Sequence, residues 1–394
     1  MKVVLAYSGG LDTSVVVHLL QDKWHADVVT VSVDVGQNQK ELKEIGEKAE
    51  KLGVIKHVHI DAKKEFVENY LFPSIKANGV YEGYPLSTAL ARYPIAAATV
   101  KVAKKVKADA VAHGCTGKGN DQFRFDTTIS TLAPNMKIIA PVRELNLDRK
   151  WEIDYAKKHG IPVPVDLSRP YSIDENMWGR SIEGGVLENP EQAPPEDIYE
   201  WTKSPESAPA KPRVVKIDFK NGLPVGLDGA KMEGMKLISR MNHLAGEHGV
   251  GRIDIMEDRV LGLKARENYE APAATVILQA HKAIEQLVLT KQELAFKAVV
   301  DQMWADLAYS GLWFDPLRED LDAFVNSTQK RVTGKVGIEL NRGFSRVVMR
   351  GSPFTLYDEE LVSFEKFGFD QRDAAGMIKF HALQGKILRK RKGA

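Results

Sequence analysis

The first residues of the chain place a glycine-rich loop directly between an apolar strand and an amphipathic helix. Residues 2–7 are short, apolar and β-branched, as a buried parallel strand is, and apolar residues recur at helical spacing from Thr13 onward. Between them, residues 8–14 read S-G-G-L-D-T-S. Because the strand runs straight into the helix, the chain starts with a β–α unit, which is typical of a parallel sheet covered by helices.

The residue types in this loop suit a phosphate group. Its two glycines let backbone N–H groups turn inward, and the helix start adds free donors and a partial positive charge. Ser8, Thr13 and Ser14 add hydroxyl donors, whereas Asp12 is unusual in an anion site unless it holds Mg²⁺. The alternative is a tight turn in which Asp12 or Thr13 only caps the helix. The coincidence of glycines, hydroxyls and a carboxylate favours the phosphate site.

The loop differs from the kinase-type phosphate loop, because G-x-x-x-x-G-K-[ST] is absent from the chain. S-G-G-x-D-[ST] instead resembles the pyrophosphate loop of the ATP pyrophosphatase superfamily. Members of that superfamily cleave ATP between the α and β phosphates and adenylate an oxygen of their substrate. The motif therefore indicates a chemistry without indicating a substrate.

Length and composition narrow the possible classes of protein. The 394 residues are 43% hydrophobic and 27% charged, as in an ordinary soluble globular protein. A net charge of +2 argues against an extended nucleic-acid surface, and no apolar stretch reaches membrane length. The single cysteine, Cys115, cannot form an intrachain disulfide, which fits a reducing compartment. We therefore expect a cytoplasmic protein that binds neither nucleic acid nor membrane.

Strands and helices alternate over the first part of the chain. After the first strand, apolar runs predict further strands at 27–35, 57–60, 109–112 and 137–140. Helical spacing predicts helices at 39–52, 94–106 and 148–159. We therefore expect an α/β domain over residues 1–165, with a doubly wound parallel sheet and ligands at the carboxyl ends of its strands.

The composition changes after this domain. Residues 188–212 are rich in Pro and Glu and predict a linker and extended excursion. A second domain over 166–365 is expected to be α+β, with strands at 213–219 and near 331–350 and helices at 231–248, 271–289 and 292–310. A last helix at 371–388, within a segment 366–394, could pack on its own subunit or reach a partner chain.

Four further segments are richer in glycine and polar residues than loops need to be. They span 81–88, 113–125, 171–185 and 257–270. The second of them suits an amino acid, since Arg and Thr can hold a carboxylate and an acidic residue can hold an ammonium. A polar turn in which Asn120 or Asp121 caps the following helix would explain each polar residue of 113–125 taken alone. It explains poorly why all of these residues occur together.

Together these motifs resemble the argininosuccinate synthetase family, from Met1 to at least Pro272. The matching segments are A-Y-S-G-G-L-D-T-S, H-G-C-T-G-K-G-N-D-Q-x-R-F, S-I-D-E-N-x-W-G-R-S-I-E-G-G and K-x-R-E-N-Y-E-A-P. The resemblance implies an ATP domain of the adenine nucleotide alpha hydrolase-like type, a synthetase and multimerisation domain, and a homotetramer. It also implies a ligase of arginine biosynthesis that joins citrulline and aspartate through citrullyl-AMP, releasing AMP and pyrophosphate.

The resemblance also assigns residues to the substrates. ATP with Mg²⁺ would bind at Ala6, Tyr7, Ser8, Gly9, Gly10, Leu11, Asp12, Thr13, Ser14, Val33 and Gly114. Citrulline would bind at Tyr84, Thr88, Ala89, Asn120, Arg124, Ser172, Ser181, Glu257 and Tyr269. Aspartate would bind at Thr116, Asn120 and Asp121. Catalytic roles fall to Asp12, Ser14 and Lys118, with Asp12 near the metal-bound pyrophosphate.

One position departs from the family pattern. Relatives often carry a hydroxyl residue where this chain has Ala89, so Thr88 could take over that part of the citrulline carboxylate clamp. No side-chain nucleophile is needed, because the substrate's own oxygen attacks the phosphate and the protein has to orient it and neutralise charge.

Three other functions are compatible with parts of the sequence. A tRNA-modifying enzyme with the same loop would usually have a cysteine pair and a basic surface, and an ammonia-using synthetase would need a glutaminase domain or partner. One cysteine and a net charge of +2 argue against the tRNA-modifying enzyme. The ammonia-using synthetase is not supported either, because the chain has no N-terminal cysteine nucleophile. A module that senses ATP without turnover stays open.

Overall fold

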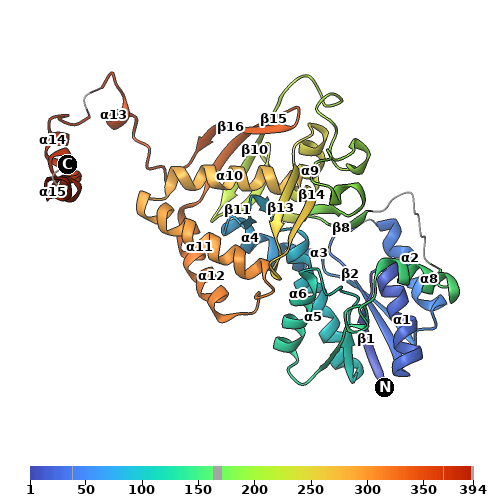
Figure 1. Cartoon of the computed structure of the whole chain (residues 1–394). Helices are drawn as coiled ribbons and strands as arrows, with labels where there is room; N and C mark the ends of the chain where they lie inside the picture. The colour runs from blue at the N-terminus through green and yellow to red at the C-terminus, as the bar shows by residue number, and fades with distance from the viewer. Residues whose placement is uncertain (38, 163–170, 367, 392–394) are drawn as a thin grey trace. The chain divides into compact units, whose positions relative to one another are not determined.

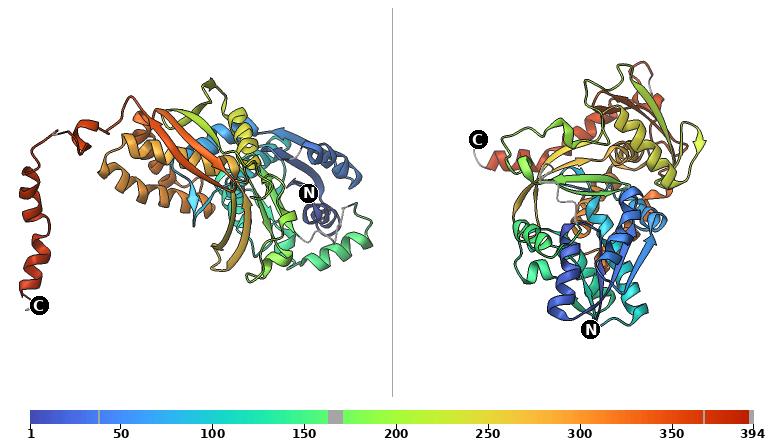
Figure 2. Two further views of the ribbon diagram at one scale, coloured as in Figure 1. Left: turned by 90° about the horizontal axis from the view of Figure 1, so that it is seen from above. Right: turned by 90° about the vertical axis from the view of Figure 1, so that its right-hand side faces the viewer.

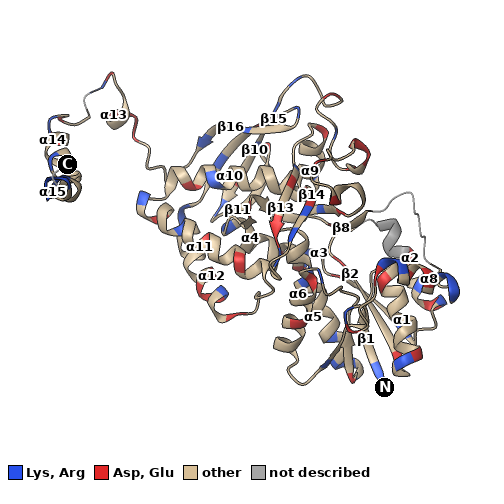
Figure 3. Ribbon diagram, in the orientation of Figure 1, with Lys and Arg blue, Asp and Glu red and all other residues tan. Residues whose placement is uncertain are grey.

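The computed structural model describes residues 1–37, 39–162, 171–366 and 368–391. The chain divides into two compact units, Met1–Phe354 and Thr355–Ala394. In the first unit, basic and acidic residues are interspersed along the elements (Figure 3).

The N-terminal part contains a five-stranded parallel sheet in the order β3-β2-β1-β6-β7 (Figure 1). Its strands are β1 (Lys2–Ala6), β2 (Asp27–Asp34), β3 (Lys56–Asp61), β6 (Ala110–Ala112) and β7 (Lys137–Ile139). The central strand β1 pairs with β2 on one side and with β6 on the other. The order of the strands therefore reverses between β1 and β6, which confirms the predicted doubly wound sheet.

Helices cover both faces of this sheet (Figure 1 and Figure 2). Alternate residues of β1 point to opposite faces, so Leu5 packs with Val16 of the first helix while Val4 belongs to the core on the other face. The longer helices are α1 (Leu11–Trp24), α2 (Gln39–Lys51), α5 (Thr88–Val106), α6 (Asp121–Leu132) and α8 (Arg149–Lys158). The short ones are α3 (Lys63–Phe66), η1 (Val67–Leu71), α4 (Phe72–Lys76) and α7 (Pro141–Glu144).

The start of α5 differs from the prediction. We expected the helix to begin at Pro94, but it begins at Thr88 and contains Pro94 inside it. Proline removes one helical hydrogen bond, and the complete burial of Leu90 and Tyr93 stabilises the extra turns. This change brings Thr88 to the helix N-terminus, at the edge of the sheet where ligands bind.

The second half of the first unit contains two antiparallel sheets, as the α+β prediction required. One has the order β12-β11-β10-β15-β16, and the other has the order β13-β14-β9-β8. The first contains β10 (Arg213–Lys220), β11 (Leu223–Leu227), β12 (Ala230–Lys231), β15 (Gly334–Asn341) and β16 (Phe344–Gly351). The second contains β8 (Ser172–Asn176), β9 (Gly179–Glu183), β13 (Arg252–Asp258) and β14 (Lys264–Glu270).

Long helices pack beside these sheets, and short elements connect them. The helices are α9 (Gly234–Glu247), α10 (Pro272–Val288), α11 (Lys291–Tyr309) and α12 (Pro316–Thr328). Smaller elements are β4 (Val80–Tyr81), β5 (Tyr84–Pro85), η2 (Gly185–Glu188), η3 (Glu196–Ile198) and η4 (Gln329–Arg331). One buried apolar cluster contains residues of β1, α5 and α10 alike, so a single core connects the two halves of this unit.

The second unit consists of short helices, α13 (Glu359–Val362), α14 (Asp373–His381) and α15 (Leu383–Arg391). We expected one helix at 371–388, but the helix is interrupted at Ala382, whose φ of −109° and ψ of 21° are not helical. Apolar side chains are exposed on it, among them Met377 with 76% of its surface accessible. Among the described helices of the chain, none is long and apolar enough to cross a membrane.

Candidate active site

The glycine-rich loop lies at the carboxyl end of β1 and leads into α1. Gly9 has a φ of +78°, and a Cβ at this position would lie 2.9 Å from Cγ1 of Ile45, so only glycine fits without strain. Gly10 is the N-cap of α1 and gives it no side-chain hydrogen bond. The amides of the first turn of α1 are therefore available for an anion.

The hydroxyl groups of this loop point in two directions. Ser8 Oγ and Thr13 Oγ1 lie 3.1 Å apart at the exposed side of the loop. Ser14 is 1% exposed, and its Oγ lies 3.1 Å from the phenol oxygen of Tyr7 inside the protein. Ser14 is thus held in the interior, together with the buried Ala6 and Val33 side chains, so a nucleotide could reach these residues mainly through their backbone.

The loop that follows β6 lies against the glycine-rich loop. A Cβ at Gly114 would lie 3.1 Å from Cγ2 of Thr13, so the glycine allows the two loops to approach each other. These loops leave neighbouring strands at the point where the strand order reverses. In open α/β sheets, this crevice is where ligands bind.

A cavity of about 650 Å³ opens beside the glycine-rich loop. Predicted site residues Asp12, Thr116 and Ser172 line it, from three different parts of the chain. Basic side chains also line it, namely Arg149, Arg259, Lys264 and Arg266. Its size and its cations suit a nucleotide with several phosphates.

Two carboxyl groups lie together in this cavity. Glu152 is 3% exposed, and its Oε1 has no hydrogen-bond partner within the described part of the chain. Burial and the neighbouring Asp12 carboxylate raise the pKa of Glu152 to about 8. A divalent cation with oxygen ligands would fit this pair, because its charge would remove the repulsion between the carboxylates.

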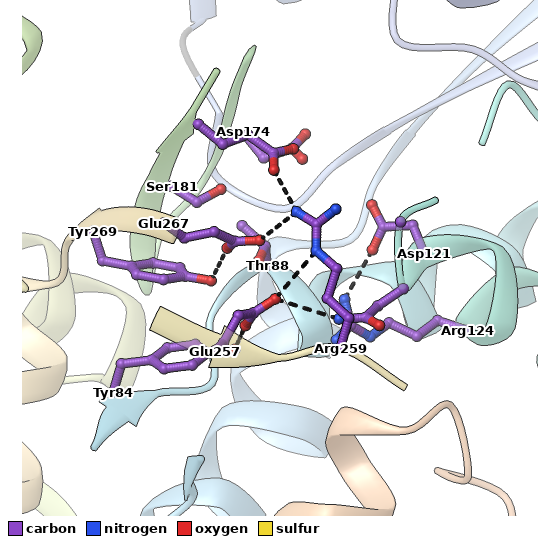
Figure 4. Close-up of a pocket in the computed structure, with 13 residues that line it drawn as sticks. Tyr84, Thr88, Asp121, Arg124, Asp174, Ser181, Glu257, Arg259, Glu267 and Tyr269 are labelled. Carbon is purple, nitrogen blue, oxygen red and sulfur yellow. Dashed lines mark hydrogen bonds and ion pairs between the residues drawn. The ribbon is translucent and has the colours of Figure 1, made fainter. Parts of the chain in front are cut away.

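A smaller cavity of about 60 Å³ lies between the first half of the unit and the sheet β13-β14-β9-β8 (Figure 4). It brings together many of the predicted amino-acid ligands: Tyr84, Thr88, Asn120, Asp121, Arg124, Ser181, Glu257 and Tyr269. They come from segments almost 190 residues apart in the sequence, so the fold assembles this site from both halves.

Glu257 lies at the centre of a hydrogen-bonded group in this cavity. The hydroxyl of Tyr84 donates to its Oε2 at 2.7 Å, and Nδ2 of Asn120 lies 3.5 Å from its Oε1. The ring of Tyr84 stacks on that of Tyr269 with 4.4 Å between centroids. Burial and, next, the Glu267 carboxylate raise the pKa of Glu257 to about 7, so a cationic ligand would favour its charged form.

Asp121 is held between two arginines. Nε of Arg92 donates to its Oδ2 at 2.8 Å, and Nη1 of Arg124 donates to its Oδ1 at 2.9 Å. Burial alone would raise the pKa of Asp121, but the two guanidinium groups lower it below the ordinary value. Arg92 also binds Asp174, so a chain of charges runs along this side of the cavity.

Arg259 projects into the group of carboxylates between the two cavities (Figure 4). Its Nη2 lies 2.6 Å from Glu183 and 3.1 Å from Glu267, and its Nε lies 3.6 Å from Glu257. Burial and repulsion from Glu267 raise the pKa of Glu183 to about 7. A single guanidinium therefore contacts more carboxylates at this point than its one charge can neutralise.

Four charged residues of the smaller cavity had no predicted role, although they lie in the segments that the sequence marks as rich in glycine and polar residues. They are Asp174, Glu183, Arg259 and Glu267. A signal was present, because each of these residues lies two positions from a predicted ligand: Ser172, Ser181, Glu257 and Tyr269. Alternate residues of a strand share one face, so a polar period of two marks the face of this sheet that lines the site.

The structure leaves some predicted residues outside the two cavities. Ala89 is 2% exposed and belongs to the apolar core, whereas the neighbouring Thr88 lines the smaller cavity. Lys118 has an exposed side chain and lines neither cavity, although its backbone oxygen lies 3.5 Å from Nη1 of Arg259. Thr116 and Ser172 lie in the larger cavity, away from the other amino-acid ligands.

Two family models match almost the whole chain. The arginosuccinate synthase N-terminal HUP domain matches residues 2–162, and the arginosuccinate synthase C-terminal domain matches residues 171–388. The chain belongs to the argininosuccinate synthase family. It is therefore a ligase of arginine biosynthesis, and the family implies the use of ATP.

Curated relatives agree with this family over their full length. Argininosuccinate synthase of Methanocaldococcus jannaschii is 60% identical, over 99% of this chain and 98% of the relative. That of Archaeoglobus fulgidus is 58% identical over 99% of each chain, and that of Methanopyrus kandleri is 55% identical over 100% of each. Since the relatives match from end to end, the shared family extends over both cavities.

Proposed function

We propose that this chain joins citrulline to aspartate at the junction of its two cavities, with ATP in the larger one. The observation that carries this proposal is that the larger cavity, beside the glycine-rich loop, meets a smaller cavity suited to an amino acid, and that the two cavities share Glu183 and Arg259. A reaction between a nucleotide phosphate and an amino-acid side chain needs such a junction, because the reacting atoms have to meet in one place.

ATP would lie over the carboxyl end of the sheet. The backbone of the glycine-rich loop and the first turn of α1 would hold its phosphates. Val33 lies near the end of β2 and Gly114 just after β6, the strands on either side of β1, and their backbones would hold the adenosine part. Ser14 would contribute through its backbone, because its hydroxyl is held by Tyr7.

Mg²⁺ would accompany the pyrophosphate end of ATP. Asp12, with the adjacent Glu152, would hold it from the wall of the larger cavity, where the buried Oε1 of Glu152 lacks a hydrogen-bond partner within the described residues. When bound, the ion would neutralise charge on the leaving pyrophosphate.

Citrulline would occupy the smaller cavity with its ureido group toward the larger one. Glu257 would accept its ammonium, since this carboxylate is buried and, among the residues that the structure describes, its one ion-pair partner is Arg259 at 3.6 Å. Arg124 and Thr88 would hold its carboxylate, and Thr88 would replace the hydroxyl that Ala89 lacks. Ser181 lines the smaller cavity and Ser172 lines the larger one.

Aspartate would bind beside them, at Thr116, Asn120 and Asp121. The low pKa of Asp121 keeps it ionised, as an ammonium partner has to be. Asn120 lies between the amino-acid sites, because it also contacts Glu257 and the hydroxyl of Tyr309.

The chemistry proceeds in two displacements. The ureido oxygen of citrulline attacks the α phosphorus, its new O–P bond forms, and the bond to the bridging oxygen breaks as pyrophosphate leaves. The aspartate amine then attacks the ureido carbon, AMP leaves with the C–O electron pair, and the amine gives up a proton. The protein's part is to orient the reactants and to place cations around the phosphates.

An assay of pyrophosphate and argininosuccinate tests this proposal. We expect both products with ATP, citrulline and aspartate together, and argininosuccinate only when all three are present. Pyrophosphate release that does not depend on citrulline would contradict the proposal, and so would nucleotide binding without any turnover.

Assembly and location belong to the same proposal. The exposed apolar residues of α14, including Met377, Ile378 and Phe380, would be covered in a homotetramer. The single cysteine supports a reducing, cytoplasmic compartment.

A further inference from the structure

Two side chains separate the larger cavity from the smaller one. Glu183 and Arg259 are the residues common to the linings of both cavities, and their side chains form an ion pair at 2.6 Å. Glu183 ends β9, and Arg259 directly follows β13. The two side chains that both cavities share therefore lie at strand ends.

Arg259 occupies part of the cavity in which citrulline is proposed to bind. The cavity is small, at about 60 Å³, and Arg259 is the long, flexible side chain that projects into it (Figure 4). Citrulline binding would therefore displace this side chain.

The contacts of Arg259 allow such a movement. Its guanidinium is shared among Glu183, Glu267 and Glu257 at 2.6, 3.1 and 3.6 Å, and the side chain keeps 15% of its surface exposed. If the ammonium of citrulline pairs with Glu257, this carboxylate has a second cation beside it. The guanidinium then loses part of the attraction that holds it in the smaller cavity.

We propose that Arg259 is a gate between the cavities and a further catalytic residue. When citrulline and ATP are both present, its guanidinium separates from Glu183 and binds the α phosphate. The inference rests on the function proposed above. A guanidinium suits this place because its N–H groups match two phosphate oxygens at once. While the ureido O–P bond forms and pyrophosphate leaves, negative charge at the α phosphate would be neutralised by Arg259.

Isotope exchange between labelled pyrophosphate and ATP, with citrulline but without aspartate, measures this first step alone. We expect R259Q to lower the maximal exchange rate about 100- to 1,000-fold. R259K, which keeps the charge but not the paired N–H groups, should fall between R259Q and the wild type. Calorimetric titration of R259Q should give dissociation constants for ATP and for citrulline within about fivefold of the wild-type values. Such a change is smaller than the tenfold difference that corresponds to about 1.4 kcal/mol.

The matched control is R346Q, which removes the same charge from an exposed Arg–Glu pair that lines neither cavity. It should exchange at the wild-type rate. If R259Q also exchanges at that rate, or if only its citrulline KM rises, Arg259 is not a catalytic residue. If thermal unfolding shows that R259Q does not fold, R259K becomes the test variant. A wild-type exchange rate in R259K would then overturn the inference. A wild-type protein without citrulline-dependent exchange would instead contradict the proposed function.

Discussion

At the scale of single residues, burial and neighbours give the carboxylates of the site different charges near neutral pH. The two arginines beside Asp121 lower its pKa, whereas burial and mutual repulsion raise those of Glu183 and Glu257 to about 7. The first therefore stays an anion near neutral pH, whereas the other two are only partly charged there, and a further cation would favour their charged forms. A ligand ammonium is such a cation, which fits a site for amino acids.

Asp121 provides a prediction about substrate preference. D121N should raise the aspartate KM about ten- to a hundredfold and the citrulline KM less, because a charge-assisted contact contributes about 1.5–3 kcal/mol. Steady-state kinetics with each substrate varied would measure both values. D320N, an exposed change on α12, is the control. Equal losses for the two amino acids would show that Asp121 does not discriminate between them.

Asp12 provides a prediction about the metal. D12N should abolish pyrophosphate release while the fold is retained, and should weaken Mg²⁺ binding to the ATP complex about 10- to 100-fold. Titration of Mn²⁺ by electron paramagnetic resonance measures the binding independently of turnover. D22N, an exposed change on the same helix, should behave as the wild type. Near-normal turnover of D12N would remove the metal role from this residue.

At the scale of elements, the sequence predicted strands with regular apolar patterns but missed strands with polar patterns. The strand β2 is almost entirely buried and rich in valine, so its sequence predicts it directly. The hairpins β8–β9 and β13–β14 were missed as strands, because their alternating residues are polar where they face the site. Ser181 pairs across strands with Asp174 and Tyr269, and this register cannot be read from one segment alone.

The contact of α10 with α11 depends on a buried charged group outside the site. Nζ of Lys297 lies 2.7 Å from Asp301 and 3.1 Å from Glu285, and it donates to the backbone oxygen of Lys76 at 2.8 Å. K297M should lower the free energy of unfolding by about 3–5 kcal/mol, because it leaves buried carboxylates without their cation. Urea unfolding measures this difference.

The control for this change is K282M, at an exposed position on α10. Surface substitutions of this kind usually change stability by less than about 0.5 kcal/mol. If K297M and K282M unfold at the same urea concentration, the buried lysine adds no stability to this contact.

At the scale of the whole molecule, the sequence motifs grouped residues that line the two cavities, but they did not indicate how these residues divide between the cavities. The resemblance grouped Ser172 with the citrulline ligands, but this residue lies in the larger cavity with Thr116. The position of Arg259 depends on how the sheet β13-β14-β9-β8 is placed against α5 and α6, which no local pattern encodes. Tertiary packing therefore determines which cavity each of these residues lines.

The segment after residue 354 provides a prediction about assembly. Its described helices contain no buried residues, and Ile378 and Phe380 expose 69% and 62% of their surfaces. Apolar surface of this kind marks a contact with another chain. Deletion of residues 371–394 should convert a tetramer into smaller species, as measured by light scattering. A truncated chain that folds and stays tetrameric would show that assembly depends on other surfaces.

The central claim is that the ureido oxygen of citrulline attacks the α phosphate of ATP where the two cavities meet. Citrulline labelled with ¹⁸O in its ureido group tests it directly, because that oxygen should leave on AMP when aspartate displaces it. Mass spectrometry of the AMP formed by the wild-type chain should show the label on the phosphate, one ¹⁸O per molecule formed. Label that is absent from AMP, or present in pyrophosphate, would contradict this account.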